Sequence, residues 1–273
     1  WGVKRYYQGV RPITAIRYMG NKGQSSDPLG ASYHPEGLLL EPGVCEVITA
    51  QTAAPGGRHE GVGAVGEIAV YSWPGEPGDR ATQTSPVRWI RAVDWLPYQR
   101  KNFNTPAFPG YISGHSTFSR AAAEIMTAIT GTPYFPGGLG SFTASANTYL
   151  VFERGPTQTT KLEWATYYDA ADLAGNSRRW GGIHVREDDY KGRQLGSQSG
   201  KQVWALAQKY WNGSILTESV TPAQTFQPNG SVLLTCPARR GLYYHLEYSS
   251  NLSTWTPLTS DVRSTSTKLT FTD

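Results

Sequence analysis

The sequence predicts a mainly α chain with long loops and a small C-terminal β module. Apolar residues recur at helical spacing in three segments, 116–130, 164–174 and 188–211. Turn-forming residues dominate 20–105, and a Thr/Ser-rich alternation typical of short strands follows Glu218. We therefore expect a helical domain over residues 1–214 and a β-strand module over residues 215–273.

The opening residues are expected to form a helix that ends before Pro12, because proline disfavours helical continuation. Lys4 and Arg11 are seven residues apart, two turns of such a helix, so their charged groups would point the same way about 10 Å apart. A solvated basic face is the simpler interpretation of this pair, and a site for an anion is the alternative.

A Pro/Gly-rich approach leads into Ser113-Gly114-His115 at the start of the central helix. Ser113 can cap this helix, whose free N–H groups and dipole would favour an oxyanion. A capped helix with a surface histidine explains the same residues without any function. The positions expected on the buried face are Phe118, Ala122, Ile125, Met126 and Ile129.

Two apolar runs, 67–73 and 87–95, interrupt the long irregular segment, in which His34 and His59 are expected at the surface. After the central helix, 148–153 and 159–164 flank Gly155-Pro156 and predict a hairpin.

The third helical segment follows a turn at Gly175-Asn176, which is expected to end the helix over 164–174. In the long helix over 188–211, the residues expected on the buried side are Leu195, Val203, Leu206 and Tyr210. Between the two helices, Asp188 lies one turn beyond His184 if a helix begins there, and its carboxylate would then fix the histidine tautomer.

Composition excludes some classes of function. A net charge of +4 with only 17% charged residues argues against a nucleic-acid binder and fits a local basic pocket for a small anion. No run of 18 apolar residues exists, so no membrane span is expected. Cys45 and Cys236 lie far apart in the chain, and whether they pair is left open. His245 is expected to be a packing or surface residue of the β module.

Three separated segments together carry three cations, a hydroxyl group, a glycine amide and two histidines, which are the groups that an oxyanion needs around it. These residues are Lys4, Arg11, Ser113, Gly114, His115, Arg178 and His184. Their order is Lys, six residues, Arg-Pro; then Ser-Gly-His; then Ser-Arg, five residues, His, three residues, Asp. Over residues 1 to 211 this pattern resembles the vanadium-dependent haloperoxidases and the related type-2 phosphatidic acid phosphatase superfamily.

The resemblance implies vanadate as the cofactor, with phosphate able to occupy the same site. Lys4, Arg11 and Arg178 would neutralise its equatorial oxygens, assisted by Ser113 and the Gly114 amide. His184, oriented by Asp188, would be the one covalent protein ligand of vanadium, and His115 would be the acid/base. Hydrogen peroxide and halide would be the substrates and hypohalous acid the product.

Two alternatives remain open. In a phosphatase of the same superfamily, His184 would be the nucleophile, forming a phosphohistidine, and His115 the acid for the leaving group. A non-catalytic exported structural protein with a residual oxyanion site is the other. Trp1 and Phe108 coincide with aromatic residues of the halide pocket in chloroperoxidase-like members, which favours the peroxidase, although both could be ordinary core aromatics.

The sequence also departs from the family pattern. Ile112 replaces the proline that usually precedes Ser-Gly-His. The N-terminal helices that complete the bundles of such enzymes are absent, so an N-terminal fragment or another subunit is expected to supply them. The β module looks truncated and resembles accessory domains of exported bacterial proteins, which predicts an exported protein from a bacterial source.

Overall fold

A computed structural model describes residues 1–217, 220 and 222–272. These residues form six α-helices and twelve strands, and the structure divides into two compact units, Trp1–Leu206 and Ala207–Asp273. The helical part and the small C-terminal sheet region are confirmed, whereas a mainly α description fits the helical part alone. The division falls inside the last long helix, and the domain boundary expected after residue 214 stays a prediction.

The N-terminal segment forms two helices instead of one. Helix α1 (Gly2–Tyr7) ends where Gln8 adopts a left-handed conformation with φ of 49°. Helix α2 (Pro12–Lys22) begins at the proline, because the fixed φ of proline and its missing N–H suit the first helical position. The expected helix does end before Pro12, but it stops at Tyr7, so the expectation that Lys4 and Arg11 share one helix was wrong.

The segment between residues 20 and 105 contains a three-stranded antiparallel sheet in the order β1-β2-β3. Its strands are β1 (Cys45–Val47), β2 (Ile68–Ser72) and β3 (Arg88–Arg91), with the short helices α3 (Ala50–Ala53) and η1 (Ala92–Asp94) beside them. The two apolar runs supply β2 and β3. The buried residues of this core are Cys45, Ile68, Val70 and Ala92.

The two histidines of this region, His34 and His59, were both expected at the surface. His34 lies at the surface, as predicted. His59 is fully buried, so the surface assignment was wrong: its Nδ1 lies 3.0 Å from Thr52 Oγ1 and its ring packs edge-on against Trp89. Cys45 and Cys236 are both buried free cysteines in different units.

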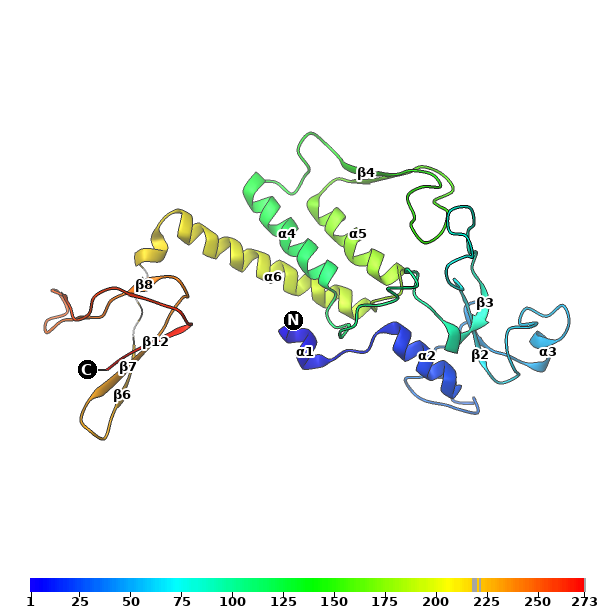
Figure 1. The fold of residues 1–273 in the computed structure, drawn as a ribbon, viewed down its shortest axis with the longest axis horizontal. Helices are drawn as coiled ribbons and strands as arrows, with labels where there is room; N and C mark the ends of the chain where they lie inside the picture. Colours follow the sequence, from blue (N-terminus) through cyan, green and yellow to red (C-terminus); the bar gives the residue numbers. More distant parts are fainter. Residues whose placement is uncertain (218–219, 221, 273) are drawn as a thin grey trace. The chain divides into compact units, whose positions relative to one another are not determined.

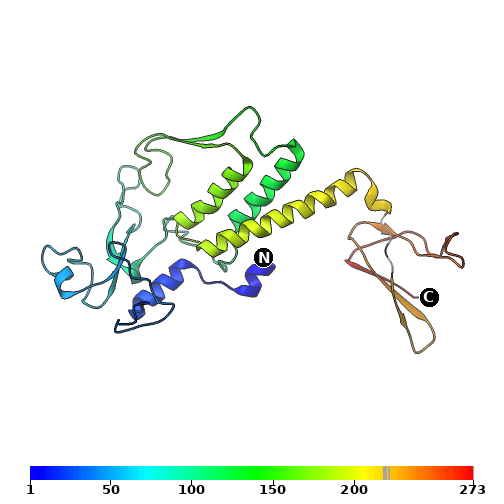
Figure 2. The same cartoon turned by 180° about the vertical axis from the view of Figure 1, so that it is seen from behind.

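Three helices form the centre of the first unit and lie side by side in both views (Figures 1 and 2). They are α4 (Gly114–Thr130), α5 (Tyr167–Trp180) and α6 (Arg186–Trp211). Helix α5 does not end at Gly175-Asn176. Gly175 is an internal contact residue, since a Cβ there would lie 2.4 Å from Asp189 Oδ1.

The buried face predicted for α4 was wrong. Phe118 is 76% exposed, and Met126 and Ile129 are also exposed, whereas Ser116 and Ala123 are buried. The contact with α6 explains the difference, because it uses small residues that bring the two backbones close together.

Helix α6 supplies a stripe of glycines at a spacing of four, Gly192, Gly196 and Gly200. A Cβ on Gly196 would lie 2.3 Å from the Thr117 carbonyl oxygen of α4. The apolar residues expected to be buried on α6, Val203, Leu206 and Tyr210, are exposed, and Leu195 is half-buried.

The predicted hairpin has a different first strand. Strand β5 (Thr160–Trp164) pairs antiparallel with β4 (Gly140–Ala144), with Phe142 opposite Leu162. Residues 148–153 form no strand, because this segment is fixed through a side chain instead. The buried carboxylate of Glu153 accepts hydrogen bonds from the Ser85 N–H and the Tyr98 hydroxyl group.

The second unit contains a three-stranded antiparallel sheet in the order β12-β7-β6. Its strands are β6 (Ala223–Phe226), β7 (Val232–Pro237) and β12 (Lys268–Thr272). Two short pairs are β8 (Tyr243–Tyr244) with β11 (Val262–Arg263), and β9 (Glu247–Tyr248) with β10 (Thr256–Pro257). A short helix, η2 (Ser214–Thr217), precedes them, and His245 is a surface residue that pairs with Asp261.

None of the helices in the described part of the chain has the length and apolar character that a membrane span requires.

Candidate functional site

The site is built around the buried imidazole of His184, at the start of α6. Its Nδ1 lies 2.8 Å from Asp188 Oδ2, one helical turn further on, and its Nε2 lies 3.0 Å from Arg11 Nη1. Because a guanidinium group only donates, Nε2 must be the acceptor and Nδ1 must carry the proton that Asp188 accepts. With Nε2 accepting from Arg11, the ring carries a single proton and is neutral, and burial lowers its pKa despite the hydrogen bond to Asp188.

Arg11, at the N-terminal end of α2, connects His184 to the loop before α4. Besides facing His184, it donates from Nη1 to the Ile183 carbonyl oxygen at 2.9 Å and from Nε to the Phe108 carbonyl oxygen at 3.0 Å. Burial and the nearby charge of Arg178 lower its pKa, while Asp188 raises it. The buried guanidinium is therefore fixed by two segments that are distant from it in the sequence, 108–109 and 183–184.

Lys4 reaches the same loop from α1. Its Nζ donates to the carbonyl oxygens of Pro109 and Gly110, each at 3.0 Å. Burial and the charge of Arg11 lower the pKa of this ammonium group to about 8. Lys4 and Arg11 thus meet although they lie on separate helices. These backbone acceptors were missed by sequence reasoning, because a carbonyl group leaves no side-chain signal; only the Pro/Gly-rich composition marked the loop.

The start of α4 contributes the second side of the site. Ser113 is fully buried; its Oγ accepts a hydrogen bond from the Ser116 N–H, and its own N–H donates to the Asp188 carbonyl oxygen at 2.9 Å. A Cβ on Gly114 would meet no atom within 4 Å, so the first turn of α4 adjoins open space.

His115 and Arg178 complete the set of polar groups. The imidazole of His115 reaches solvent, and desolvation, the charge of Arg178 and the proximity of His184 together lower its pKa. Arg178 lies in the last turn of α5, and burial lowers its pKa. Its Nε is buried and has no hydrogen-bond partner among the described residues. A buried cationic donor without an acceptor fits an anionic ligand.

An aromatic pair lies beside the cations. The rings of Trp1 and Phe108 are edge-on with centroids 4.9 Å apart, and the Phe108 centroid lies 5.3 Å from Lys4 Nζ and 5.2 Å from Arg11 Cζ. Trp1 is 79% and Phe108 39% exposed, so neither is an ordinary core aromatic. The structure therefore brings the predicted site residues from all three segments into one unit.

These features place cations, N–H donors and two imidazoles together beside the central helices. Residues 62–213, more than half of the chain, match a family model described as the VCPO second helical-bundle domain, and the chain belongs to the vanadium haloperoxidase family. A search of curated proteins finds no match.

One solved structure supports the fold by its TM-score, and two others are similar over smaller parts of the chain. An apo-type bacterial vanadium-dependent chloroperoxidase is similar with a TM-score of 0.52 and 18% identity, over 77% of this chain and 33% of that one. For a holo-type bacterial vanadium-dependent chloroperoxidase the TM-score is 0.44 and the identity 20%, over 52% of this chain and 27% of that one. For a bacterial vanadium-dependent iodoperoxidase the TM-score is 0.28 and the identity 31%, over 40% of this chain and 23% of that one. The chain thus spans about a third of the length of the first of these proteins.

Proposed function

We propose that the protein is a vanadate-dependent haloperoxidase that oxidises a halide with hydrogen peroxide to hypohalous acid. The observation that carries this proposal is the neutral His184, which Asp188 holds with its Nε2 lone pair directed toward a group of cations. Membership of the vanadium haloperoxidase family supports the same conclusion.

The residues fit vanadate. No group of three or more His, Cys, Asp or Glu among the described residues could hold a bare metal ion, whereas an oxyanion needs cations and N–H donors. His184 Nε2 would be the single imidazole ligand, and Lys4, Arg11 and Arg178, whose buried Nε has no partner among the described residues, would neutralise the oxygens. When bound, vanadate would supply the activation of hydrogen peroxide toward attack by a halide.

His115 is the group that we assign to proton transfer. Desolvation and the charge of Arg178 lower its pKa, which favours the neutral imidazole that would accept a proton from hydrogen peroxide at the solvent-facing side of the site. Trp1 and Phe108 would form the wall that a halide approaches, since their exposed rings exclude water beside Lys4 and Arg11.

A phosphatase is the alternative, because the same cations and the same imidazole would accept phosphate by charge and shape. His184 would then act as the nucleophile and His115 as the acid for the leaving group. The aromatic pair favours the peroxidase, since a phosphomonoester does not require an apolar wall next to its phosphate.

One experiment separates these proposals. The folded protein is titrated with vanadate and assayed for halogenation of a dye with hydrogen peroxide and bromide, and in parallel for hydrolysis of a phosphomonoester. We expect vanadate-dependent halogenation that is lost in His184→Ala. Phosphomonoester hydrolysis that vanadate merely inhibits would establish the phosphatase. Failure to bind either oxyanion would indicate a non-catalytic protein with a residual site.

We infer that an apolar helical segment or subunit covers the exposed face of α4, where Phe118, Met126 and Ile129 lie. The match to a second helical-bundle domain supports this partner.

We also propose that the protein is exported. Cell fractionation tests this proposal, and recovery in the cytosol alone would contradict it.

A further inference from the structure

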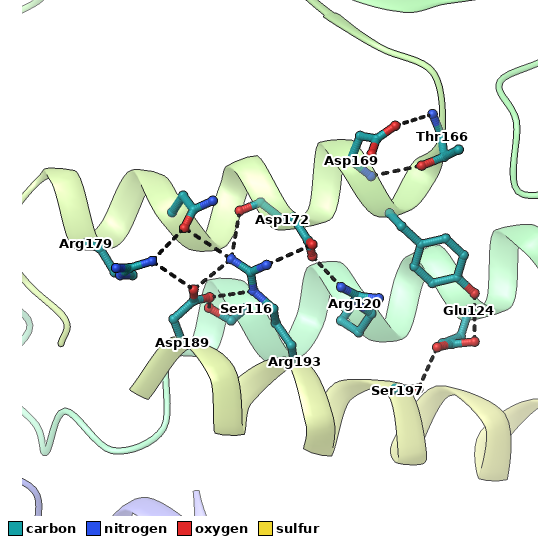
Figure 3. Close-up of polar contacts among 12 residues, drawn as sticks. Ser116, Arg120, Glu124, Thr166, Asp169, Asp172, Arg179, Asp189, Arg193 and Ser197 are labelled. Carbon is teal, nitrogen blue, oxygen red and sulfur yellow. Dashed lines mark hydrogen bonds and ion pairs between the residues drawn. The ribbon is translucent and has the colours of Figure 1, made fainter. Parts of the chain in front are cut away.

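One buried carboxylate joins the three central helices. Asp189 of α6 is fully buried, and a charge in that position is costly unless it is paired and hydrogen-bonded. Its Oδ1 accepts from Ser116 Oγ of α4 at 2.7 Å and from Arg193 Nε at 2.9 Å, and its Oδ2 accepts from Arg193 Nη2 at 2.7 Å. Arg179 of α5 lies 3.9 Å from the same oxygen (Figure 3).

The backbone of α5 passes directly over this carboxylate. A Cβ on Gly175 would lie 2.4 Å from Asp189 Oδ1 and 2.9 Å from Ser116 Oγ. The absence of a side chain at Gly175 therefore allows α4, α5 and α6 to meet at a single group. The carboxylate sets the distance between the helices as well as neutralising Arg193.

On each of the three helices, the residue that contributes to this contact directly follows a residue of the oxyanion site. Ser116 follows His115, Arg179 follows Arg178, and Asp189 follows Asp188, the partner of His184. Consecutive residues of a helix are about 100° apart, so one can face the helix interface while its neighbour faces the site. Any movement of the three helices at the carboxylate would change the spacing of the site residues.

We propose that Asp189 is a positioning residue for the oxyanion site, acting through Ser116 and Arg179 to fix His115 and Arg178 relative to His184. This inference rests on the proposed function. Asp189 does not touch the ligand; it sets the geometry in which the cations and imidazoles meet it.

A second carboxylate provides a matched control. Asp172 of α5 also pairs with Arg193, at 2.8 Å, and with Arg120 of α4 (Figure 3). It is more exposed than Asp189, and neither Ala171 nor Leu173 beside it belongs to the site. Asp172→Asn therefore removes a carboxylate from the same arginine without acting on a neighbour of a site residue.

The test uses the full chain with Asp189→Asn, Ser116→Ala and Asp172→Asn. Ser116→Ala removes only the link to α4, so it keeps the test valid if Asp189→Asn does not fold. Vanadate and phosphate affinities are measured by calorimetry below the melting temperature of each variant. The imidazole NMR signals of His115 and His184 are recorded in the protein free of oxyanion, which gives a readout independent of turnover.

We expect Asp189→Asn and Ser116→Ala to weaken vanadate binding by about 10–100-fold, the range found when groups that orient a ligand are removed. The His115 signals should shift in both variants, while Asp172→Asn should show parental affinity and parental signals, with a smaller loss of melting temperature than Asp189→Asn because Asp172 is partly exposed. Parental affinity and unmoved signals in Ser116→Ala, with oxyanion binding by the parent intact, would overturn the positioning role alone. A parent chain that binds neither vanadate nor phosphate would instead overturn the proposed function, and this inference with it.

Discussion

Arg11 Nη1 lies 3.0 Å from His184 Nε2, on the opposite edge of the imidazole from Asp188. The ring is therefore held at both nitrogen atoms, with its proton on Nδ1. A ligand that bonds to Nε2 has to replace Arg11 at that position. If an oxyanion binds His184 as we propose, its binding and the release of the Arg11 contact would be one event.

Replacement of His184 should have the largest effect on binding. His184→Ala removes the imidazole nitrogen that faces Arg11, so we expect most vanadate affinity to be lost. Asp188→Asn keeps the ring but weakens the acceptor that fixes its tautomer, and should cost about 10–100-fold in affinity. Calorimetric titration with vanadate measures both, with His245→Ala in the second unit as the control. Binding like the parent in His184→Ala would refute the ligand assignment.

His115 should separate catalysis from binding. His115→Ala removes the proton acceptor but leaves Lys4, Arg11 and Arg178 to hold the anion. We expect turnover to fall by about 10²–10⁴-fold, the usual value of acid–base catalysis, with only a moderate loss of vanadate affinity. Steady-state halogenation and titration of the same preparation measure the two effects, and His34→Ala provides a surface histidine control. Full activity in His115→Ala would show that another group transfers the proton.

The lowered pKa of Lys4 predicts how anion binding depends on pH. The ammonium group loses its proton as the pH rises through about 8, so its contribution to oxyanion affinity should be present below pH 8 and absent well above it. In Lys4→Arg the charge persists, so the decline attributable to residue 4 should disappear. Phosphate affinity measured on both sides of pH 8 in the parent and the variant cancels the titration of phosphate itself. Identical curves would contradict the assignment.

The lowered pKa of Lys4 also affects stability, but here the effect of rising pH is favourable, whereas for anion binding it is unfavourable. The pKa of Lys4 is about 8 in the folded chain against 10.5 as its ordinary value, so between these values the unfolded chain binds more protons. The contribution of Lys4 to the free energy of unfolding should therefore increase with pH across that interval. Denaturant titrations of the parent and Lys4→Met measure it, and an equal pH dependence in both would rule it out.

The site was more predictable from the sequence than the packing around it. Ser113 has the side chain of a helix cap, and Asp188 follows His184 at the spacing of one helical turn, so local rules place both. The close contact of α4 with α6 depends on Gly192, Gly196 and Gly200. Glycine has no side chain, so a hydrophobic pattern gives no sign of such a contact. Large apolar residues were consequently assigned to the interior although glycine and serine occupy it.

The remaining differences arise from backbone groups and long-range contacts. Lys4 and Arg11 converge because both donate to the carbonyl groups of residues 108–110, and not because they share a helix. Nothing in the side chain of Gln8 indicates the left-handed turn that separates the two helices. Residues 148–153 have the composition of a strand, but the buried carboxylate of Glu153 fixes them against distant loops.

The exposed side of α4 should tolerate charge in the isolated chain. Phe118 is 76% exposed, so Phe118→Glu removes little buried apolar surface and should change the free energy of unfolding by no more than about 0.5 kcal/mol. The same change should block association with a helical partner that covers this face. Thermal unfolding measures the first effect and co-purification with the partner segment the second. A large loss of stability in the isolated chain would show that Phe118 is already buried there.

The glycine stripe of α6 gives the sharpest test of the packing. In Gly196→Ala the new Cβ would lie 2.3 Å from the Thr117 carbonyl oxygen and 3.0 Å from Arg120 Cβ, so α4 and α6 must move apart. Overpacking of this kind costs about 1–3 kcal/mol, and alanine gains up to about 1 kcal/mol over glycine in helix propensity. Because the contact is with a backbone oxygen, we expect the clash to dominate and the melting temperature to fall. Gly2→Ala, where a Cβ meets no atom within 4 Å, is the matched control and should leave the melting temperature unchanged or raise it. If both variants behave alike, the two helices do not approach each other through Gly196.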